Sequence, residues 1–427
     1  MTRPFDLILF GATGFTGRLV AEVLQTRLGA QKPQSRLGAR EPSAGAPPLR
    51  WALAGRSLDK LKAVRQGIGA GDDLPLLVVD AADTKAVADL VGQTRLVITT
   101  VGPYQRYGEP LVAACAEAGT DYVDLCGEPA WMARMVQQWQ ATAEASGARI
   151  VFSCGFDSIP FDLGVVVLQH HAQARFGTAL REVHSLVKVM KGAVSGGTVA
   201  SALATFEDIA KRPDQALVMA DPFALTPGFK GPAQLDPGDV ASFDALAGLW
   251  TAPFVMATIN TKNVHRTNAL RGHPWGRDFV YVERFATGKG AKGQGLAHLL
   301  AAQARLQNGL LGFAPSRKLL QRVVLPSPGQ GPGPAQREAG RYELLIVGSH
   351  PAGHQLRLRV KGKRDPGYGA TSRLITESAL CLLQDVNQQH TPGGVWTAGA
   401  AMGLALQRRL AEFADLHFTV DDAKAAA

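Results

Sequence analysis

The feature that most constrains this chain is a glycine-rich turn close to its N-terminus. The apolar run Asp6–Phe10 predicts a buried strand, Gly14–Leu28 predicts a helix, and Gly-Ala-Thr-Gly-Phe-Thr-Gly occupies positions 11–17 between them. In such a strand–turn–helix unit the three glycines allow a tight turn, the approach of a pyrophosphate to backbone N–H groups, and close packing of the helix on the sheet. The helix N-terminus then faces the negative charge. This order predicts a dinucleotide-binding domain.

The first 157 residues alternate apolar runs with amphipathic helical patterns, which is typical of a parallel sheet with crossover helices. The predicted strands are Asp6–Phe10, Arg50–Ala54, Leu76–Asp80, Leu96–Val101, Tyr122–Cys126 and Arg149–Ser153. The predicted helices are Gly14–Leu28, Leu58–Ile68, Thr84–Val91, Glu109–Ala118 and Pro129–Ala145. This set makes a complete Rossmann-type, doubly wound parallel sheet, so the predicted fold class is α/β. The Pro- and Gly-rich segment Leu28–Leu49 is predicted to be a surface insertion.

A second domain of α+β type is predicted over residues 158–371. Its predicted strands are Glu182–Val189, Phe279–Phe285, Tyr342–Val347 and Gln355–Val360, and a loop dense in Pro and Gly is predicted at Pro326–Pro334. We expect this domain to hold the substrate-binding and oligomerisation surfaces, and the chain to form a homodimer. Residues 372–427 contain helical patterns at Ser372–Gln389 and Trp396–Ala414, which we expect to pack back on the first domain.

The charge and the cysteines exclude some classes of partner. The 427 residues include 45 Lys and Arg against 36 Asp and Glu, which gives a net charge of +9, but the basic residues are scattered and no nucleic-acid-binding motif occurs. We therefore expect attraction to anionic small molecules or membrane surfaces, and no nucleic-acid partner. The four cysteines lie far apart and form no CxxC pair, so neither a disulfide framework nor a metal site is predicted.

The distribution of apolar residues bears on location. The N-terminus leads directly into the first strand, so no signal peptide is expected. The most apolar stretch, Gly295–Phe313, includes His298 and Arg305, and it falls short of the roughly 20 clean apolar residues that a membrane span requires. It can lie on a membrane but is not expected to cross one. We expect a cytoplasmic protein, with peripheral membrane contact as an open alternative.

The end of the second predicted strand indicates which dinucleotide binds. An NAD site usually has an acidic side chain there for the ribose 2′-hydroxyl, whereas this chain has Arg56 and Ser57. Arg56 can pair with a 2′-phosphate, so NADP(H) is favoured over NAD(H). The alternative is a solvated arginine followed by a serine that starts a helix. Asp80, which ends the third strand, is expected either beside the adenine or as a cap of the next helix.

Small residues follow the fourth predicted strand and leave room for the nicotinamide ribose at the carboxyl edge of the sheet. Tyr104 is the first bulky polar side chain after this turn and can enter the cleft. The residues that we expect to bind the cofactor are Gly11, Thr13, Gly14, Phe15, Thr16, Gly17, Arg56, Ser57, Asp80, Thr100, Gly102 and Pro103.

Longer motifs occur along nearly the whole chain. The distinctive ones are Gly-Thr-Asp-Tyr-Val-Asp at 119–124 and Gly-Phe-Asp-Ser-Ile-Pro-Phe-Asp at 155–162. The others are Gly11–Gly17, Ala54–Ser57, Val101–Tyr104, Ala114–Cys115, Leu125–Glu128, Leu163–Gly164, Ser195–Thr198, Pro328–Pro332 and Gly393–Thr397. In these motifs the chain resembles the saccharopine dehydrogenase-like oxidoreductase family, most closely its branch of trans-acting enoyl reductases.

This resemblance implies a Rossmann domain, an α+β domain and NADPH as hydride donor. In the enoyl reductase branch it also implies an unsaturated acyl substrate carried by a separate synthase. Two features depart from the family pattern: the insertion at Leu28–Leu49 is longer than expected, and Gln330 stands where an acid is expected. Neither departure touches the proposed cofactor contacts.

Three side chains are candidates for the catalytic groups. None of the six tyrosines is followed by Lys four positions later, which disfavours ketone reduction by the Tyr–Lys relay of short-chain dehydrogenases. An enoyl reductase must orient an apolar chain, polarise a carbonyl and deliver a proton, and we consider Tyr104, Glu128 and Asp157 for these roles. Each has a structural alternative: a packed ring for Tyr104, and a helix cap for Glu128 and for Asp157.

Two further features are weaker. Ser195–Thr198 predicts a helix start whose N–H groups suit a substrate oxygen or a cap alone, and His265 and His273 lack partners at a diagnostic spacing. Three interpretations therefore remain. The first is an NADPH-dependent enoyl reductase of acyl or lipid-like substrates. The second is an amino-acid or imine oxidoreductase of the saccharopine type, which would need convergent arginines for carboxylates. The third is a non-catalytic, membrane-associated NADP-binding protein.

Overall fold

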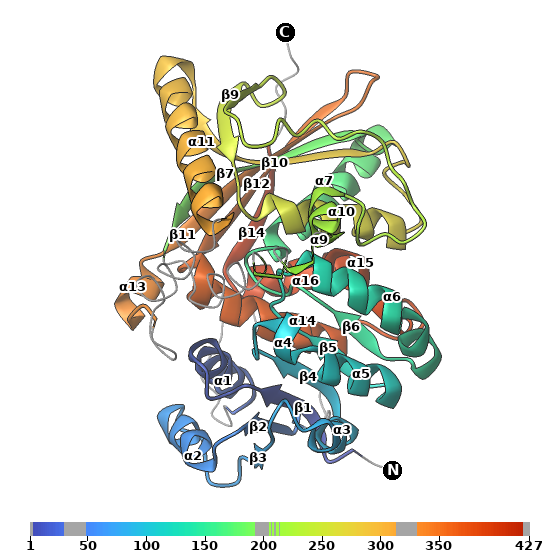
Figure 1. The fold of residues 1–427 in the computed structure, drawn as a ribbon, viewed down its shortest axis with the longest axis vertical. Helices are drawn as coiled ribbons and strands as arrows, with labels where there is room; N and C mark the ends of the chain where they lie inside the picture. The colour runs from blue at the N-terminus through green and yellow to red at the C-terminus, as the bar shows by residue number, and fades with distance from the viewer. Residues whose placement is uncertain are drawn as a thin grey trace.

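The computed structural model describes residues 3–29, 48–192, 205, 207–208, 211–212, 214–312 and 331–421. Two seven-stranded sheets organise the molecule: sheet A in the N-terminal domain, at the bottom of Figure 1, and sheet B in the second domain above it. Helix α7 (Ile159–Phe176) leads from one domain to the other and packs on three strands of sheet B. The predicted Rossmann-type α/β fold with a second α+β domain is confirmed.

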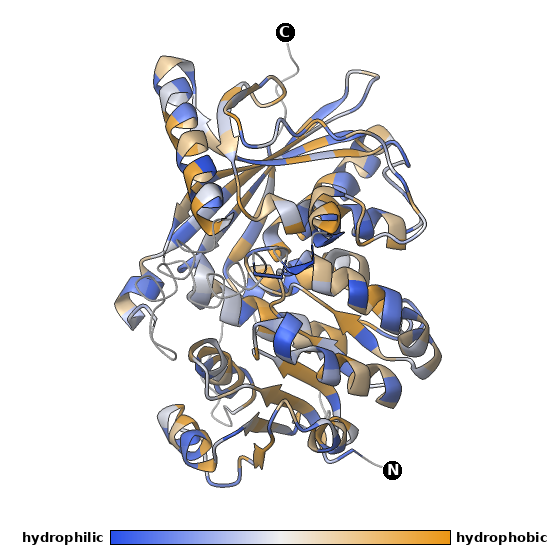
Figure 2. Ribbon diagram, viewed as in Figure 1, coloured by the Kyte–Doolittle hydropathy of each residue, from blue (hydrophilic) through white to orange (hydrophobic). Residues whose placement is uncertain are grey.

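Sheet A is parallel throughout, with the order β13-β6-β5-β4-β1-β2-β3. Its strands are β1 (Phe5–Phe10), β2 (Trp51–Gly55), β3 (Leu76–Val78), β4 (Thr94–Thr99), β5 (Asp121–Val123), β6 (Arg149–Val151) and β13 (Gly394–Trp396). The helices between them are α1 (Phe15–Leu28), α2 (Leu58–Gly67), α3 (Thr84–Gly92), α4 (Tyr104–Tyr107), α5 (Glu109–Ala118) and α6 (Pro129–Ser146). Leu7 of β1 lies opposite Trp51 of β2 and Leu96 of β4. The strands are hydrophobic along their length (Figure 2), because helices cover both faces of a parallel sheet.

Sheet B is mixed, with the order β14-β12-β11-β7-β10-β9-β8 and one parallel pair, β7 with β10. Its strands are β7 (Glu182–Lys191), β8 (Ser242–Asp244), β9 (Leu249–Pro253), β10 (Val280–Gly288), β11 (Arg341–Ser349), β12 (Gln355–Lys363) and β14 (Leu416–Asp421). Its four predicted strands correspond to β7, β10, β11 and β12. The helices of this region are α9 (Asp214–Ala220), α10 (Ala257–Leu270), α11 (Gly290–Gly312) and α13 (Pro334–Glu338). In the described part of the chain, no helix is both long and apolar enough to cross a membrane.

The C-terminal residues contribute a strand to each sheet. After a short π-helical turn, η1 (Pro366–Ala370), come α14 (Thr371–Gln384), α15 (Ala398–Ala401) and α16 (Gly403–Phe413). The helix predicted from Trp396 starts later than expected, because Trp396 ends strand β13, which pairs with β6 as the seventh strand of sheet A. A strand of three residues has no recognisable periodicity, and it forms here because the edge of β6 offers hydrogen-bonding groups. The other added strand, β14, pairs with β12 in sheet B.

Helix α14 is buried almost completely between the two domains. It packs on α1 and α16 and on β4 and β5 of sheet A, and eleven of its 14 residues are buried. Its buried hydroxyl groups donate to carbonyls one turn earlier, for example Thr376 Oγ1 to Ser372 O at 2.8 Å, so their burial leaves no unpaired donor. The buried carboxylate of Glu377 accepts hydrogen bonds from Arg27 Nε of α1 at 2.7 Å and from Arg409 Nε of α16 at 2.6 Å. One carboxylate therefore joins three helices.

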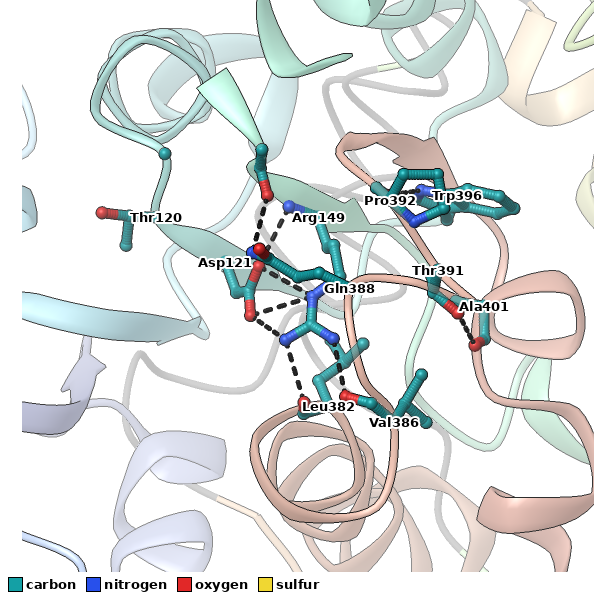
Figure 3. Close-up of polar contacts among 12 residues, drawn as sticks. Thr120, Asp121, Arg149, Leu382, Val386, Gln388, Thr391, Pro392, Trp396 and Ala401 are labelled. Carbon is teal, nitrogen blue, oxygen red and sulfur yellow. Dashed lines mark hydrogen bonds and ion pairs between the residues drawn. The ribbon is translucent and has the colours of Figure 1, made fainter. Parts of the chain in front are cut away.

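The C-terminal end of α14 is fixed by a second buried ion pair. Arg149, at the start of β6, pairs with Asp121 at the start of β5, and it also donates to Leu382 O at 2.9 Å and to Val386 O at 3.0 Å (Figure 3). The side chains of both partners are less than a tenth exposed. The amino-terminal edge of sheet A is thus tied to the segment that follows α14, on the side away from the carboxyl ends of the strands.

We predict that Glu377→Ala lowers the free energy of unfolding by about 3 to 5 kcal/mol, because it leaves Arg27 and Arg409 without their shared buried carboxylate. Urea unfolding followed by circular dichroism measures this loss. Asp72→Ala is the matched control, since the side chain of Asp72 is 98% exposed in its pair with Arg65 and its loss costs less than about 1 kcal/mol. Equal losses in the two variants would contradict the anchoring role of Glu377.

Candidate active site

A cavity of about 820 Å³ lies where the carboxyl ends of the strands of sheet A face the second domain. The first domain lines it with residues that follow β4, β5 and β6, and the second domain closes it with β7, β10, α10 and α11. Ligands of open α/β sheets bind at this edge of the sheet. Among the predicted site residues, the cavity is lined by Thr16, Thr100, Gly102, Pro103, Tyr104 and Asp157.

The glycine turn has the geometry that a dinucleotide needs. Gly11 has φ of +89°, and a Cβ there would lie 2.8 Å from a methyl group of Val101. A Cβ at Gly17 would lie 2.1 Å from the carbonyl oxygen of Gly11, so only glycine lets α1 approach the turn so closely. Gly14 precedes α1, and the first turn of this helix has neither a side-chain cap nor an acidic residue. Its N–H groups are therefore available to a pyrophosphate.

The other residues of the turn have different surroundings. Thr100 Oγ1 donates to Gly11 O at 3.1 Å and fixes the turn to the end of β4. The ring of Phe15 packs edge-on against Tyr368 of η1, with 4.7 Å between the ring centres, so it joins the turn to the segment that returns from the second domain. Its backbone N–H remains at the start of α1. The side chain of Thr13 lies about 3.4 Å from the position of a Cβ on Gly55, at the end of β2.

The end of β2 presents a free cation, as the choice of NADP(H) requires. Arg56 is exposed, and its guanidinium has no hydrogen-bond or ion-pair partner among the residues that the structure describes. Ser57 caps α2, because its Oγ accepts from Lys60 N at 3.4 Å. Asp80 does not cap α3: its carboxylate accepts from Ala82 N at 3.0 Å, and Asp83 is the cap instead. These residues fit a dinucleotide with a phosphate on its adenosine ribose.

The phenol of Tyr104 is tied to main-chain groups. Its hydroxyl donates to Thr99 O at 3.3 Å and accepts from Leu125 N at 3.0 Å, which joins the ends of β4 and β5. The ring lies against Trp131, with 5.8 Å between the ring centres. Burial raises the pKa of Tyr104 well above its usual value. The only proton of this hydroxyl is thus directed at a carbonyl of the fold.

Glu128 is also engaged with the main chain. Its carboxylate accepts from Tyr104 N at 3.1 Å and from Gln105 N at 2.8 Å, and the side chain is buried. The expected alternative was a cap for the helix after Pro129, but the carboxylate caps the short helix α4 instead, and α6 has no side-chain cap. Glu128 therefore fixes the turn after β4 from a position on the next loop of the sheet.

Asp157 is the predicted acid whose carboxylate faces the cavity. It lies in the loop between β6 and α7, and its carboxylate has no hydrogen-bond partner in the described part of the chain. Burial raises its pKa from 3.8 to about 6. The loop is held from two sides: Phe156 N donates to Thr371 Oγ1 of α14 at 3.1 Å, and Asn263 of α10 donates to Ser158 Oγ at 3.3 Å.

Several wall residues were not identified from the sequence. Met190, Phe285, Leu300 and Gln307 come from the second domain, and only their positions in sheet B and α11 bring them to the cavity. No local motif marks them. The two histidines do not line the cavity: His265 contacts Gln234 at 3.1 Å and has a pKa that burial lowers to about 3, and His273 packs on Phe229. Ser195–Thr198 and Gln330 lie outside the described residues, as does most of the predicted insertion.

Comparison with known proteins identifies a family, two relatives and a solved structure that this chain resembles. Residues 7–151 match the family model of the saccharopine dehydrogenase NADP binding domain. The chain is 39% identical, over 423 residues and 96% of both chains, to a Mycobacterium tuberculosis (strain H37Rv) protein provisionally named a trans-acting enoyl reductase. It is 35% identical, over 422 residues and 96% of both chains, to the trans-acting enoyl reductase of Mycobacterium ulcerans (strain Agy99). Apo saccharopine dehydrogenase (L-Glu forming) from Saccharomyces cerevisiae has a similar fold, with a TM-score of 0.54 at 10% identity, over 98% of this chain and 100% of that one.

We predict that Arg56→Ala weakens the binding of NADPH much more than that of NADH, because it removes a charge-assisted contact worth about 1.5 to 3 kcal/mol. Fluorescence titration of both dinucleotides gives the two dissociation constants. Lys62→Ala, at an exposed position of α2, is the matched control for the loss of one positive charge. Equal losses for NADPH and NADH in Arg56→Ala would contradict the assignment of this side chain to the 2′-phosphate.

Proposed function

This chain belongs to the saccharopine dehydrogenase-like oxidoreductase family, in its trans-acting enoyl reductase branch, and on that premise we propose that it reduces the double bond of unsaturated acyl groups. It is an NADP-dependent oxidoreductase. When bound, NADPH supplies the hydride for the β-carbon of the acyl group. The residues that would hold it are the glycine turn, Arg56 and Ser57, with the turn after β4 beside the nicotinamide end.

The chemistry of the cavity wall is the observation that supports an acyl substrate. Among the described lining residues there is no Lys, Arg or His, and the charged ones are Asp157 and Asp239. The apolar lining residues include Leu125, Met190, Met219, Phe254, Met256, Ile259, Phe285 and Leu300. Burial of an apolar acyl chain against these residues is favourable, because it removes apolar surface from water. An amino-acid or imine substrate would place its carboxylates beside aspartates without a compensating cation, which is unfavourable.

We assign the proton-transfer step to Asp157. After hydride reaches the β-carbon, the α-carbon must receive a proton, and a group with a pKa near the working pH transfers it most effectively. Asp157 faces the cavity, has no competing hydrogen bond in the described part of the chain, and has a pKa that burial raises to about 6. The carboxylic acid would donate its proton and be reprotonated from water. A catalytic acid in this position favours an enzyme over a non-catalytic NADP-binding protein.

The other two candidates are better placed to hold the site in shape. Tyr104 and Glu128 bond to main-chain groups at the ends of β4 and β5 and in α4, and they define the turn beside the nicotinamide end. We propose that both are positioning residues. That the acyl group arrives on a separate carrier is likewise a proposal, supported by the trans-acting relatives. The homodimer stays a prediction.

We predict that Asp157→Asn lowers kcat by about 10²- to 10⁴-fold, since the amide cannot donate a proton as an acid does. The dissociation constant of NADPH should stay within a factor of about two, because the cofactor contacts predicted here lie elsewhere. Stopped-flow oxidation of NADPH with an enoyl thioester measures turnover, and fluorescence titration measures binding. Asp239→Asn is the control at the other carboxylate of the cavity, which accepts from Asn308 at 3.4 Å. Unchanged turnover in Asp157→Asn would refute the assignment.

The pH dependence of turnover is a separate prediction. Only the protonated carboxyl group can donate, and the pKa of Asp157 is raised to about 6, so kcat should be highest at lower pH and fall as the pH rises through that value. A kcat profile between pH 5 and 9 at saturating substrates tests this. The inflection should persist in Asp239→Asn and disappear in Asp157→Asn. A profile that falls toward acid pH would contradict a general-acid role.

A further inference from the structure

Helix α11 is attached to its domain by a narrow strip of small residues. Of its 23 residues only Gly293, Ala297 and Ala301 are buried, where the helix packs on β9 and β10. Large apolar side chains lie on its open surface: Leu296 is 42% exposed, Leu299 64% and Leu306 65%. The helix runs along one edge of the second domain (Figure 1), and hydrophobic and hydrophilic residues mix along it (Figure 2). Exposed leucines that share one helix at the edge of a domain indicate a surface that contacts a partner.

The exposed leucines lie next to the side of α11 that lines the cavity. Leu296, Leu299 and Leu306 are three and seven residues apart and therefore share one stripe of the helix. The adjacent stripe, which contains Leu300, Ala304 and Gln307, lines the cavity. We call the first set the leucine stripe. A substrate acyl chain that slides from the leucine stripe to the adjacent stripe of α11 would pass from solvent into the cavity.

Other exposed apolar side chains lie on the same rim. Val255, in the segment between β9 and α10, is 78% exposed and also lines the cavity. Met190, at the end of β7, is 41% exposed and lines the cavity as well. Exposed apolar side chains therefore occur both on α11 and among the residues that line the cavity, which suits a substrate that enters from an apolar phase rather than from water.

The charged residues of α11 itself are all basic. Residues 289–312 contain Lys289, Lys292 and Arg305 and no Asp or Glu, and outside the helix Asp239 accepts from Asn308 at 3.4 Å. Lys289, Lys292 and Arg305, in or next to α11, have no ion-pair partner in the described part of the chain. A helix with leucines on one stripe and unpaired cations beside it matches the surface of a bilayer that contains anionic lipids. A second copy of the chain would oppose cations to cations, which disfavours it as the occupant.

From these observations we propose that α11 is a docking helix for an anionic lipid bilayer. The leucine stripe enters the headgroup region, Lys289, Lys292 and Arg305 contact the anionic headgroups, and the mouth of the cavity faces the lipid. A hydrophobic acyl chain then reaches the cavity without crossing water. The entry of substrate by this route rests on the proposed function, whereas the docking itself does not.

Flotation with lipid vesicles tests the docking directly. The full-length protein should float with vesicles of phosphatidylcholine and phosphatidylglycerol at low salt, bind vesicles of phosphatidylcholine alone more weakly, and dissociate as salt is raised. Leu299→Gln/Leu306→Gln should lower the partition coefficient about tenfold or more, because two apolar anchors are lost. Both positions are exposed, so the fold should tolerate the change. Leu235→Gln, at a leucine that is 58% exposed outside α11, is the control and should bind like the unchanged protein.

The same variants separate docking from catalysis. Turnover of a water-soluble enoyl thioester should be equal in the unchanged protein and in Leu299→Gln/Leu306→Gln, so loss of flotation with retained turnover supports the proposal. If no enoyl thioester is turned over but flotation depends on the leucine stripe, the proposed function fails and the docking stands. Absence of binding to the anionic vesicles would overturn the docking. So would a dimer, seen by light scattering, that the double substitution dissociates, because the stripe would then belong to a second copy.

Discussion

Helix α14 comes from the C-terminal part of the chain, yet it is buried against sheet A between α1 and α16. Its middle is fixed by Glu377, whose carboxylate is shared by two arginines from different helices, and its end is fixed by Arg149 from the start of β6. Burial of a carboxylate costs least where a cation matches its charge and hydrogen bonds satisfy its oxygens, and both conditions are met at Glu377. This helix therefore ties the C-terminal part of the chain to sheet A.

The same helix also shapes the site. Thr371, in its first turn, accepts the N–H of Phe156 and so holds the loop that presents Asp157 to the cavity. Just before it, Tyr368 packs on Phe15 of the glycine turn. One segment that returns from the second domain therefore contacts both the glycine turn and the loop that contains Asp157. A displacement of this segment would move the two parts of the site together.

Charge is distributed unequally between the outside and the inside of the molecule. The chain carries a net charge of +9, but the described wall of the cavity contains no cation. Basic side chains lie instead at the end of β2, which is followed by Arg56, and in or next to α11, which has Lys289, Lys292 and Arg305. This arrangement leaves the positive charge on the surface and an uncharged or acidic lining in the cavity, and it leaves Asp157 in surroundings where desolvation alone raises its pKa.

The sequence alone determined the features that depend on neighbouring residues. The glycine spacing at 11–17 follows from the backbone conformation of one turn, and Arg56 follows from the end of the adjacent strand. Six strands of sheet A follow from apolar runs long enough to show their pattern. Only the tertiary structure shows that Tyr104 and Glu128 bond to main-chain groups, whereas Asp157 lines the cavity without a hydrogen-bond partner among the described residues. The contacts that position these groups come from distant parts of the chain: Thr371 is 215 residues from Phe156. For the same reason the tertiary structure alone revealed β13 as the seventh strand and α11 as a cavity wall, since pairing with a distant edge or packing on a distant sheet leaves no periodicity within the segment itself.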